Sequence, residues 1–230
     1  MPAYFTNGKT NYYNFDFQAY LESPAIKSTL GDLSFYKSWV SNWCDEFDTK
    51  DKELLELSRL NPPQNPLLER QAAEKRDVET FQSTFITPVG DYIYQYDVDK
   101  LLGLVENNNV AKEIFNIDEV FIDPKTEFDV DKINDKRLPI VVRTFGEKIS
   151  FICVDGNKRL TAQMKINKIG NFKAYVLTPE YSKHFFFTSI DRAFYDLHVE
   201  IQILGVSKMM NLSDNDLLRM IKMRDISNSK

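Results

Sequence analysis

The residues with the clearest potential for chemistry are five consecutive ones, Asp155, Gly156, Asn157, Lys158 and Arg159. The glycine allows a sharp backbone bend, and the sequence that follows it predicts a helix. The first turn of a helix has N–H groups without intrahelical partners and carries the positive end of the helix dipole. With two cations in that turn, the segment predicts a phosphate-binding site. Asp155 is its acidic candidate for catalysis.

Arg143 is a further candidate for the same anion, because it ends the strand expected before the bend. Two plainer interpretations stay open. In the first, Arg143 is only a surface residue of that strand. In the second, Asp155 only caps the following helix, a position where aspartate is common, and the two cations after Gly156 are solvent-exposed.

The elements expected to position the bend are two strands, a helix and a third strand. They cover residues 138–145, 148–154, 157–169 and 172–177. Gly146 fits the turn of a hairpin between the first two strands, and Gly170 fits the C-cap of the helix. The apolar run over 119–124, stopped by a proline, predicts one more strand upstream.

These elements in this order resemble the ParB/sulfiredoxin-like superfamily. Within it, they are similar to the N-terminal domain of ParB. The resemblance covers about residues 117–179 and rests on three segments, 139–143, 149–162 and 172–177. It implies a small sheet with phosphate bound where the helix starts. The implied ligand is a nucleotide or a nucleic acid such as DNA, with a nucleoside triphosphate carrying Mg²⁺ as the implied cofactor. Nucleotide-hydrolase or nuclease activity is also implied.

The residue after the glycine departs from that family. ParB proteins have a Gly-Glu-Arg-Arg-x-Arg-Ala box, whereas Asn157 replaces the acidic residue here and Thr161 replaces an arginine. An amide cannot act as a general base or hold a metal as a carboxylate does. The resemblance therefore implies phosphate binding more directly than hydrolysis. Sulfiredoxins have their cysteine at the position of Asn157, and we expect Cys153, on the preceding strand, to be a buried structural cysteine.

A second resemblance involves Fic/Doc proteins, in which Asp-Gly-Asn-Lys-Arg also occurs. Their motif has a histidine five residues before the glycine, where this chain has Phe151. Without that histidine no general base is available to deprotonate a target hydroxyl. Their motif also joins two helices, whereas residues 149–154 predict a buried strand. A Fic-like nucleotide transferase that lacks its histidine is therefore a minor alternative.

The remaining chain is expected to be mainly helical, which makes the fold class α+β. Residues 1–116 form the helical N-terminal region, and residues 181–230 form C-terminal helices packed on the core as one compact unit. Trp39 and Trp43 repeat at helical spacing and are expected in the core. Residues 67–85 predict a polar helix. Residues 186–204 predict an amphipathic helix that ends at Gly205.

The composition limits the classes of function. The net charge of −5 means that any nucleic-acid contact needs a local basic patch, which we expect at Lys158, Arg159, Lys165, Lys168 and Lys173. Two cysteines and two histidines without ligand spacing predict no metal site. The chain shows no signal peptide or membrane span, so we expect a cytoplasmic protein without a membrane partner.

A non-catalytic protein-interaction or regulatory role on the same scaffold, with a protein partner, is the main alternative to phosphate binding. The sequence leaves the oligomeric state open.

Overall fold

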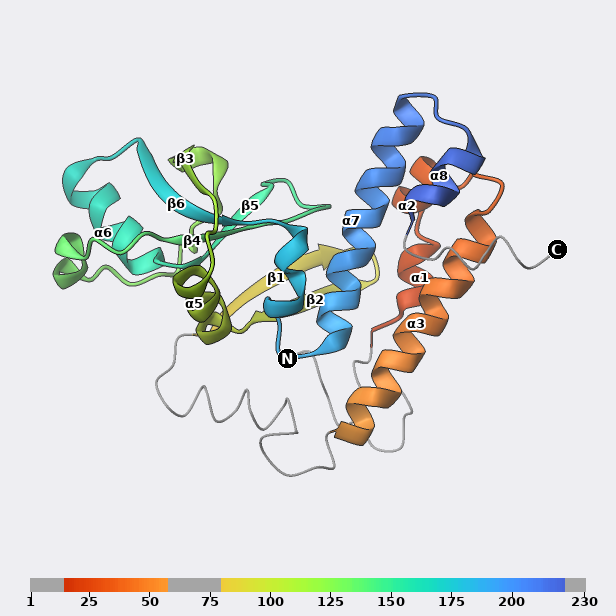
Figure 1. The fold of residues 1–230 in the computed structure, drawn as a ribbon, viewed down its shortest axis with the longest axis horizontal. Helices are drawn as coiled ribbons and strands as arrows, with labels where there is room; N and C mark the ends of the chain where they lie inside the picture. The colour runs from red at the N-terminus through yellow and green to blue at the C-terminus, as the bar shows by residue number, and fades with distance from the viewer. Residues whose placement is uncertain (1–14, 58–79, 222–230) are drawn as a thin grey trace. The chain divides into compact units, whose positions relative to one another are not determined.

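The computed structural model describes residues 15–57 and 80–221, and it is a mixed α+β structure with two small sheets and flanking helices (Figure 1). The chain divides into two compact units. The first, called here the helical unit, contains the described residues 15–57, 83–94 and 188–221. The second, called the sheet unit, contains 80–82 and 95–187. Among the described residues, none of the helices is both long and apolar enough to cross a membrane.

The helical unit contains five helices and most of a two-stranded sheet. Its helices are α1 (Phe17–Leu21), α2 (Pro24–Leu30), α3 (Tyr36–Leu57), α7 (Ser189–Met209) and α8 (Asp214–Met220). The sheet consists of β1 (Phe81–Thr87) and β2 (Gly90–Tyr96), joined by a short turn. The two long helices α3 and α7 pack against each other.

Aromatic side chains dominate the core of the helical unit. Trp39 and Trp43 are each 1% exposed, which confirms their expected place in the core. Phe17 stacks on Phe47 with 3.9 Å between ring centroids, and Tyr92 stacks on Phe194 at 4.0 Å. Stacked and edge-to-face pairs of this kind add stabilisation beyond the apolar area that they bury.

The sheet unit is built on a mixed four-stranded sheet in the order β3-β6-β4-β5. Its strands are β3 (Lys112–Asn116), β4 (Ile140–Arg143), β5 (Phe151–Asp155) and β6 (Asn171–Leu177). β6 pairs antiparallel with β3 and parallel with β4, and β4 pairs antiparallel with β5. The other elements are α5 (Val98–Asn107), α6 (Asn157–Asn167) and the 3-10 helices η1 (Ile117–Glu119), η2 (Val130–Asn134) and η3 (Pro179–His184).

The predicted hairpin, helix and return strand are confirmed as β4, β5, α6 and β6. Gly146 lies in the hairpin turn with φ of 73°, a conformation that favours glycine. Leu160 of α6 packs with Val141, Cys153 and Val176 of the sheet. The bend after β5 is therefore fixed on both sides by buried apolar contacts.

Two predicted elements differ in kind from those in the structure. The strand expected over 119–124 is absent from this described segment, where only Phe121 forms an isolated bridge, to Ile152. The side chains of Asn116 and Glu119 form a capping box that starts η1 instead. The helix expected over 67–85 lies partly outside the described residues, and its described end belongs to β1. There the burial alternates with the period of two that strands have.

Two predicted helix ends also differ. α6 ends at Asn167, and its C-cap is Lys168 rather than Gly170; Lys168 takes the left-handed conformation with φ of 50°. α7 continues through Gly205 to Met209, because an interior glycine costs a helix only about 1 kcal/mol and packing overrides it. α5 and β3 belong to the sheet unit, and the described residues from 188 onward belong to the helical unit.

Candidate functional site

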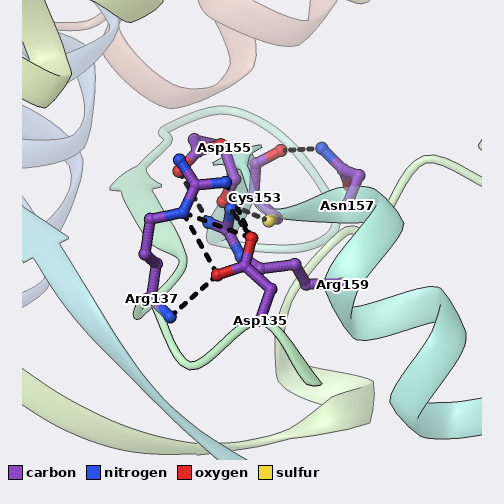
Figure 2. A network of polar contacts seen from close by, with 6 residues as sticks. All are labelled: Asp135, Arg137, Cys153, Asp155, Asn157 and Arg159. Atoms are coloured by element: carbon purple, nitrogen blue, oxygen red, sulfur yellow. Dashed lines mark hydrogen bonds and ion pairs between the residues drawn. The ribbon is translucent and has the colours of Figure 1, made fainter. Parts of the chain in front are cut away.

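The predicted bend joins the end of β5 to the start of α6 (Figure 2). Gly156 has φ of 103°, which L side chains rarely adopt. A Cβ atom at this position would lie 2.9 Å from Nη2 of Arg159 and 3.0 Å from Cβ of Pro139. Both the backbone conformation and the space therefore require glycine here.

Arg159 is buried in the sheet unit and forms ion pairs with two aspartates. Its Nη2 donates to Oδ2 of Asp155 over 2.7 Å, and its Nη1 lies 3.6 Å from Oδ2 of Asp135. The side chains of Arg159 and Asp155 are only 5% and 4% exposed. The Nε atom of Arg159 is buried and has no hydrogen-bond partner in the described structure. The guanidinium is thus held in place while one of its donors stays unsatisfied.

A second arginine completes this group of charges. Nε and Nη2 of Arg137 donate to the carboxylate of Asp135, with the shortest distance 2.7 Å, and the backbone N–H of Arg137 donates to it as well. Figure 2 shows Asp135 between the two arginines. The hydrogen bond from Arg137, reinforced by the charge of Arg159, holds the pKa of Asp135 well below its usual value, against the opposing effect of burial. We call Asp135, Arg137, Asp155 and Arg159 the Asp–Arg cluster.

Asn157 fastens the bend to the neighbouring loop. Its Nδ2 donates to the carbonyl oxygen of Cys153 over 2.8 Å, and its Oδ1 accepts the backbone N–H of Asp123 over 3.0 Å. An amide can donate and accept at once, whereas an ionised carboxylate only accepts. The two contacts therefore require a side chain that both donates and accepts, and asparagine supplies one.

Cys153 is fully buried, as expected for a structural cysteine. Its Sγ donates to the carbonyl oxygen of Asp155 over 3.2 Å. The thiol therefore contributes to the shape of the bend rather than facing a ligand.

The two outer cations lie in different places. Lys158 is exposed in the first turn of α6. Arg143 pairs in register with Phe151, whereas Ile140, at the other end of β4, pairs with Asp155. Four residues of strand span about 13 Å, so Arg143 lies away from the bend and is not brought to it. Its guanidinium lies 5.3 Å from the ring centroid of Phe145.

The start of α6 has the backbone features of an anion site. No side chain caps it, and the first intrahelical bond runs from the N–H of Leu160 to the carbonyl of Gly156. The surface of α6 presents lysines at 158, 165 and 168, spaced by two turns and then by one. Lys165 lies 5.2 Å from the ring centroid of Phe128. Arg159, expected in the same basic patch, is instead buried in the Asp–Arg cluster.

Asp135, Arg137 and the backbone of Asp123 are parts of this site that the sequence did not indicate. The only signal was a charged run, Asp135-Lys136-Arg137, just before the strand β4. In the described part of the chain, no group of three or more histidine, cysteine, aspartate or glutamate side chains is placed to hold a metal ion.

Comparison with known proteins adds no relative to this picture: no protein-family model, curated protein or solved structure matches the chain significantly. Its resemblance to ParB/sulfiredoxin-like proteins rests on the residues quoted from the sequence.

Proposed function

We propose that the chain binds a phosphate group of a nucleotide or nucleic acid at the start of α6. The observation that carries this proposal is the uncapped helix start at Gly156, together with the buried, unsatisfied Nε of Arg159 in the first turn of the same helix. Unpaired N–H groups and the helix dipole favour an anion at such a position. The ParB-like order of strand, bend, helix and strand supports the same ligand class.

Each residue of the bend has a separate role in this proposal. The backbone N–H groups of Asn157 and Lys158 donate to phosphate oxygens, and the exposed ammonium of Lys158 adds a positive charge. The Nε of Arg159 supplies a further donor. The aspartates of the Asp–Arg cluster orient that guanidinium, and Asn157 holds the backbone of the bend in position.

The site supports binding better than cleavage. The carboxylate of Asp155 is engaged by Arg159, and both polar atoms of the Asn157 side chain are hydrogen-bonded. Neither side chain is therefore placed to serve as a general base or as a ligand to Mg²⁺. These residues do not fit a Mg²⁺ site, and the proposal contains no hydrolytic step.

The test is isothermal titration calorimetry with CTP, ATP and a short DNA, using the wild-type chain, Lys158→Ala and Lys148→Ala. Lys158 and Lys148 are both exposed, and Lys148 lies in the hairpin turn away from the bend. Loss of one charge-assisted contact, about 1.5 kcal/mol, weakens binding roughly tenfold. We expect that loss for Lys158→Ala and wild-type affinity for Lys148→Ala. Binding of none of the three ligands, or equal affinities for all three proteins, overturns the proposal.

The alternative protein-interaction function has one observation in its favour. Met209, Met210 and Met220 are 76%, 69% and 50% exposed at the end of α7 and in α8. Exposed methionines suit adaptable protein contacts. Light scattering of the wild-type chain and of Met209→Gln with Met210→Gln tests self-association through this surface. A change in molar mass between the two proteins favours it, and identical masses count against it.

A further inference from the structure

A groove of about 750 Å³ lies in the helical unit, distinct from the bend after β5. It is bordered by α1, α2 and α3. Its lining includes Glu22, Lys27, Tyr36, Lys37, Val40 and Cys44. Sites for small ligands typically have volumes of about 300–1,000 Å³, so the groove has room for one.

The floor of the groove is apolar and fixed. Tyr36 and Val40 are buried, and Cys44 is half-buried beside them along α3. The hydroxyl of Tyr36 donates to the carbonyl oxygen of Leu21 over 2.7 Å, so that ring cannot swing out of the groove. An extended ligand can therefore lie along α3 over a preformed surface.

The rim of the groove has opposite charges at its two ends. Lys37, Ser41 and Asp45 follow one another at intervals of four residues on α3. Lys37 and Asp45 are eight residues apart, which corresponds to about 12 Å along a helix. Across the groove, Glu22 and Lys27 form a long ion pair of 3.9 Å, and both belong to the rim.

Several carboxylates act on the Cys44 end of the groove. Burial raises the pKa of the Cys44 thiol to about 11, and the charges of Asp48, Asp45, Glu22 and Asp16 add to this rise. These charges make the negative ion of the thiol unfavourable. The same potential favours a cation placed beside Cys44.

We propose that this groove binds a short peptide with unblocked termini. Its ammonium group lies among the carboxylates near Cys44, and its carboxylate lies near Lys37. Three or four extended residues, at about 3.3 Å each, span the distance between Lys37 and Asp45. The apolar floor at Tyr36 and Val40 accepts the small side chains of such a peptide. This site is independent of the phosphate site proposed for α6.

The experiment is calorimetric titration of the full chain with trialanine, N-acetyl-trialanine and trialanine amide. The acetyl group removes the cation and the amide removes the anion, while the length stays nearly the same. We expect trialanine to bind and each blocked peptide to bind at least tenfold more weakly. No binding of trialanine, or equal affinity for trialanine and either blocked peptide, overturns the proposal.

Variants connect each end of the peptide to one residue. Asp45→Asn is expected to reduce the preference for trialanine over its N-acetyl form, because the other carboxylates near Cys44 remain, and Lys37→Met is expected to abolish the preference over its amide. Lys52→Met and Glu56→Gln change exposed charges of the same helix outside the groove, and they should keep both preferences. Unchanged preferences in Asp45→Asn and Lys37→Met, or their loss in the controls as well, would place the peptide elsewhere and overturn the assignment.

Discussion

The two units of this molecule give their buried ionisable groups different partners. In the sheet unit, the buried Arg159 forms ion pairs with Asp155 and Asp135, and the exposed Arg137 also pairs with Asp135. Desolvation of Arg159 and Asp155 is offset by the opposite charge and by a short hydrogen bond. Removal of Arg159 therefore leaves Asp155 buried without a cation.

In the helical unit, two buried ionisable groups on α7, Glu200 and His198, form hydrogen bonds with neutral side-chain and backbone groups. Glu200 accepts the indole N–H groups of Trp39 and Trp43 over 2.6 and 3.0 Å. Nδ1 of His198 lies 2.7 Å from the carbonyl oxygen of Phe194, and its Nε2 lies 2.6 Å from the hydroxyl of Tyr20. Since a carbonyl only accepts, Nδ1 carries the proton of a neutral imidazole and Nε2 accepts from the tyrosine.

Groups that are buried to the same degree therefore have different roles in the two units. Ion pairs in the sheet unit fix a backbone bend that faces a proposed ligand, and their strength depends on every partner being present. In the helical unit, hydrogen bonds between ionisable side chains and neutral groups join helices that are distant in sequence, and we expect them to tolerate small changes better. Loss of a partner should therefore destabilise the sheet unit most. A fall from about pH 6.5 to 4, the range in which His198 takes up its proton, should destabilise chiefly the helical unit.

The largest effect is expected for Arg159→Met. This change keeps the apolar stem but leaves Asp155 buried without its cation, and breaking a buried ion pair costs about 3–5 kcal/mol. The free energy of unfolding from urea titration at pH 7 measures the loss. Adding Asp155→Asn removes the stranded charge, so the double variant should recover part of the stability.

Lys158→Met is the matched control, because it changes a cation that is exposed in the same helical turn. Its effect should stay within about 0.5 kcal/mol, as for other surface substitutions. If the two single variants lose the same stability, the Asp–Arg cluster is not the stabilising feature inferred here.

The next effect is a dependence of the helical unit on acid. Burial lowers the pKa of His198 to about 4, while the hydrogen bond to Phe194 opposes this shift. The unfolded histidine has a pKa of about 6.5 and takes up a proton first as the pH falls, so roughly 3 kcal/mol of stability is lost between about pH 6.5 and 4. Above about pH 6.5, His198 does not make the free energy of unfolding depend on pH.

The measurement is the free energy of unfolding at pH 7, 6, 5 and 4 for the wild type, His198→Phe and His184→Phe. His198→Phe is less stable at pH 7, because Tyr20 loses its acceptor, but its loss of stability on acidification should be smaller than that of the wild type. His184 is the other histidine of the chain, and its replacement controls for the loss of an imidazole as such. Equal slopes in all three proteins would show that His198 does not cause the acid sensitivity.

Local sequence signals predicted the bend well. Runs of valine, isoleucine and phenylalanine around Gly146 and Gly156 indicated β4, β5 and the start of α6. The backbone conformation of these segments depends mainly on residues that are adjacent in the chain, so the sequence alone is enough to predict it. The predicted helix over 67–85 is wrong at its described end, which belongs to β1. The prediction followed the charged residues before Phe81 and gave too little weight to the short alternation of apolar residues that follows.

The partners of these side chains could not be predicted from the sequence, because they depend on contacts between segments that are distant in the chain. Asp135 reaches Arg159 only because the chain between η2 and β4 returns beside the bend. Arg143 was expected near the phosphate, but antiparallel register places the end of β4 opposite the start of β5. Neither spacing nor residue type reveals such a register.

The smallest effect is expected for Glu200→Gln, in which the side chain keeps its shape and can still accept from an indole N–H. Neutral hydrogen bonds are weaker than charge-assisted ones, so the loss should be roughly 1–2 kcal/mol. The chain has two tryptophans, and both donate to this carboxylate, so intrinsic fluorescence reports directly on the change. Glu56→Gln, an exposed change on α3, should leave both the spectrum and the stability unaltered. A loss for Glu200→Gln that equals the loss for Arg159→Met would mean that the two units do not differ in their dependence on buried charge.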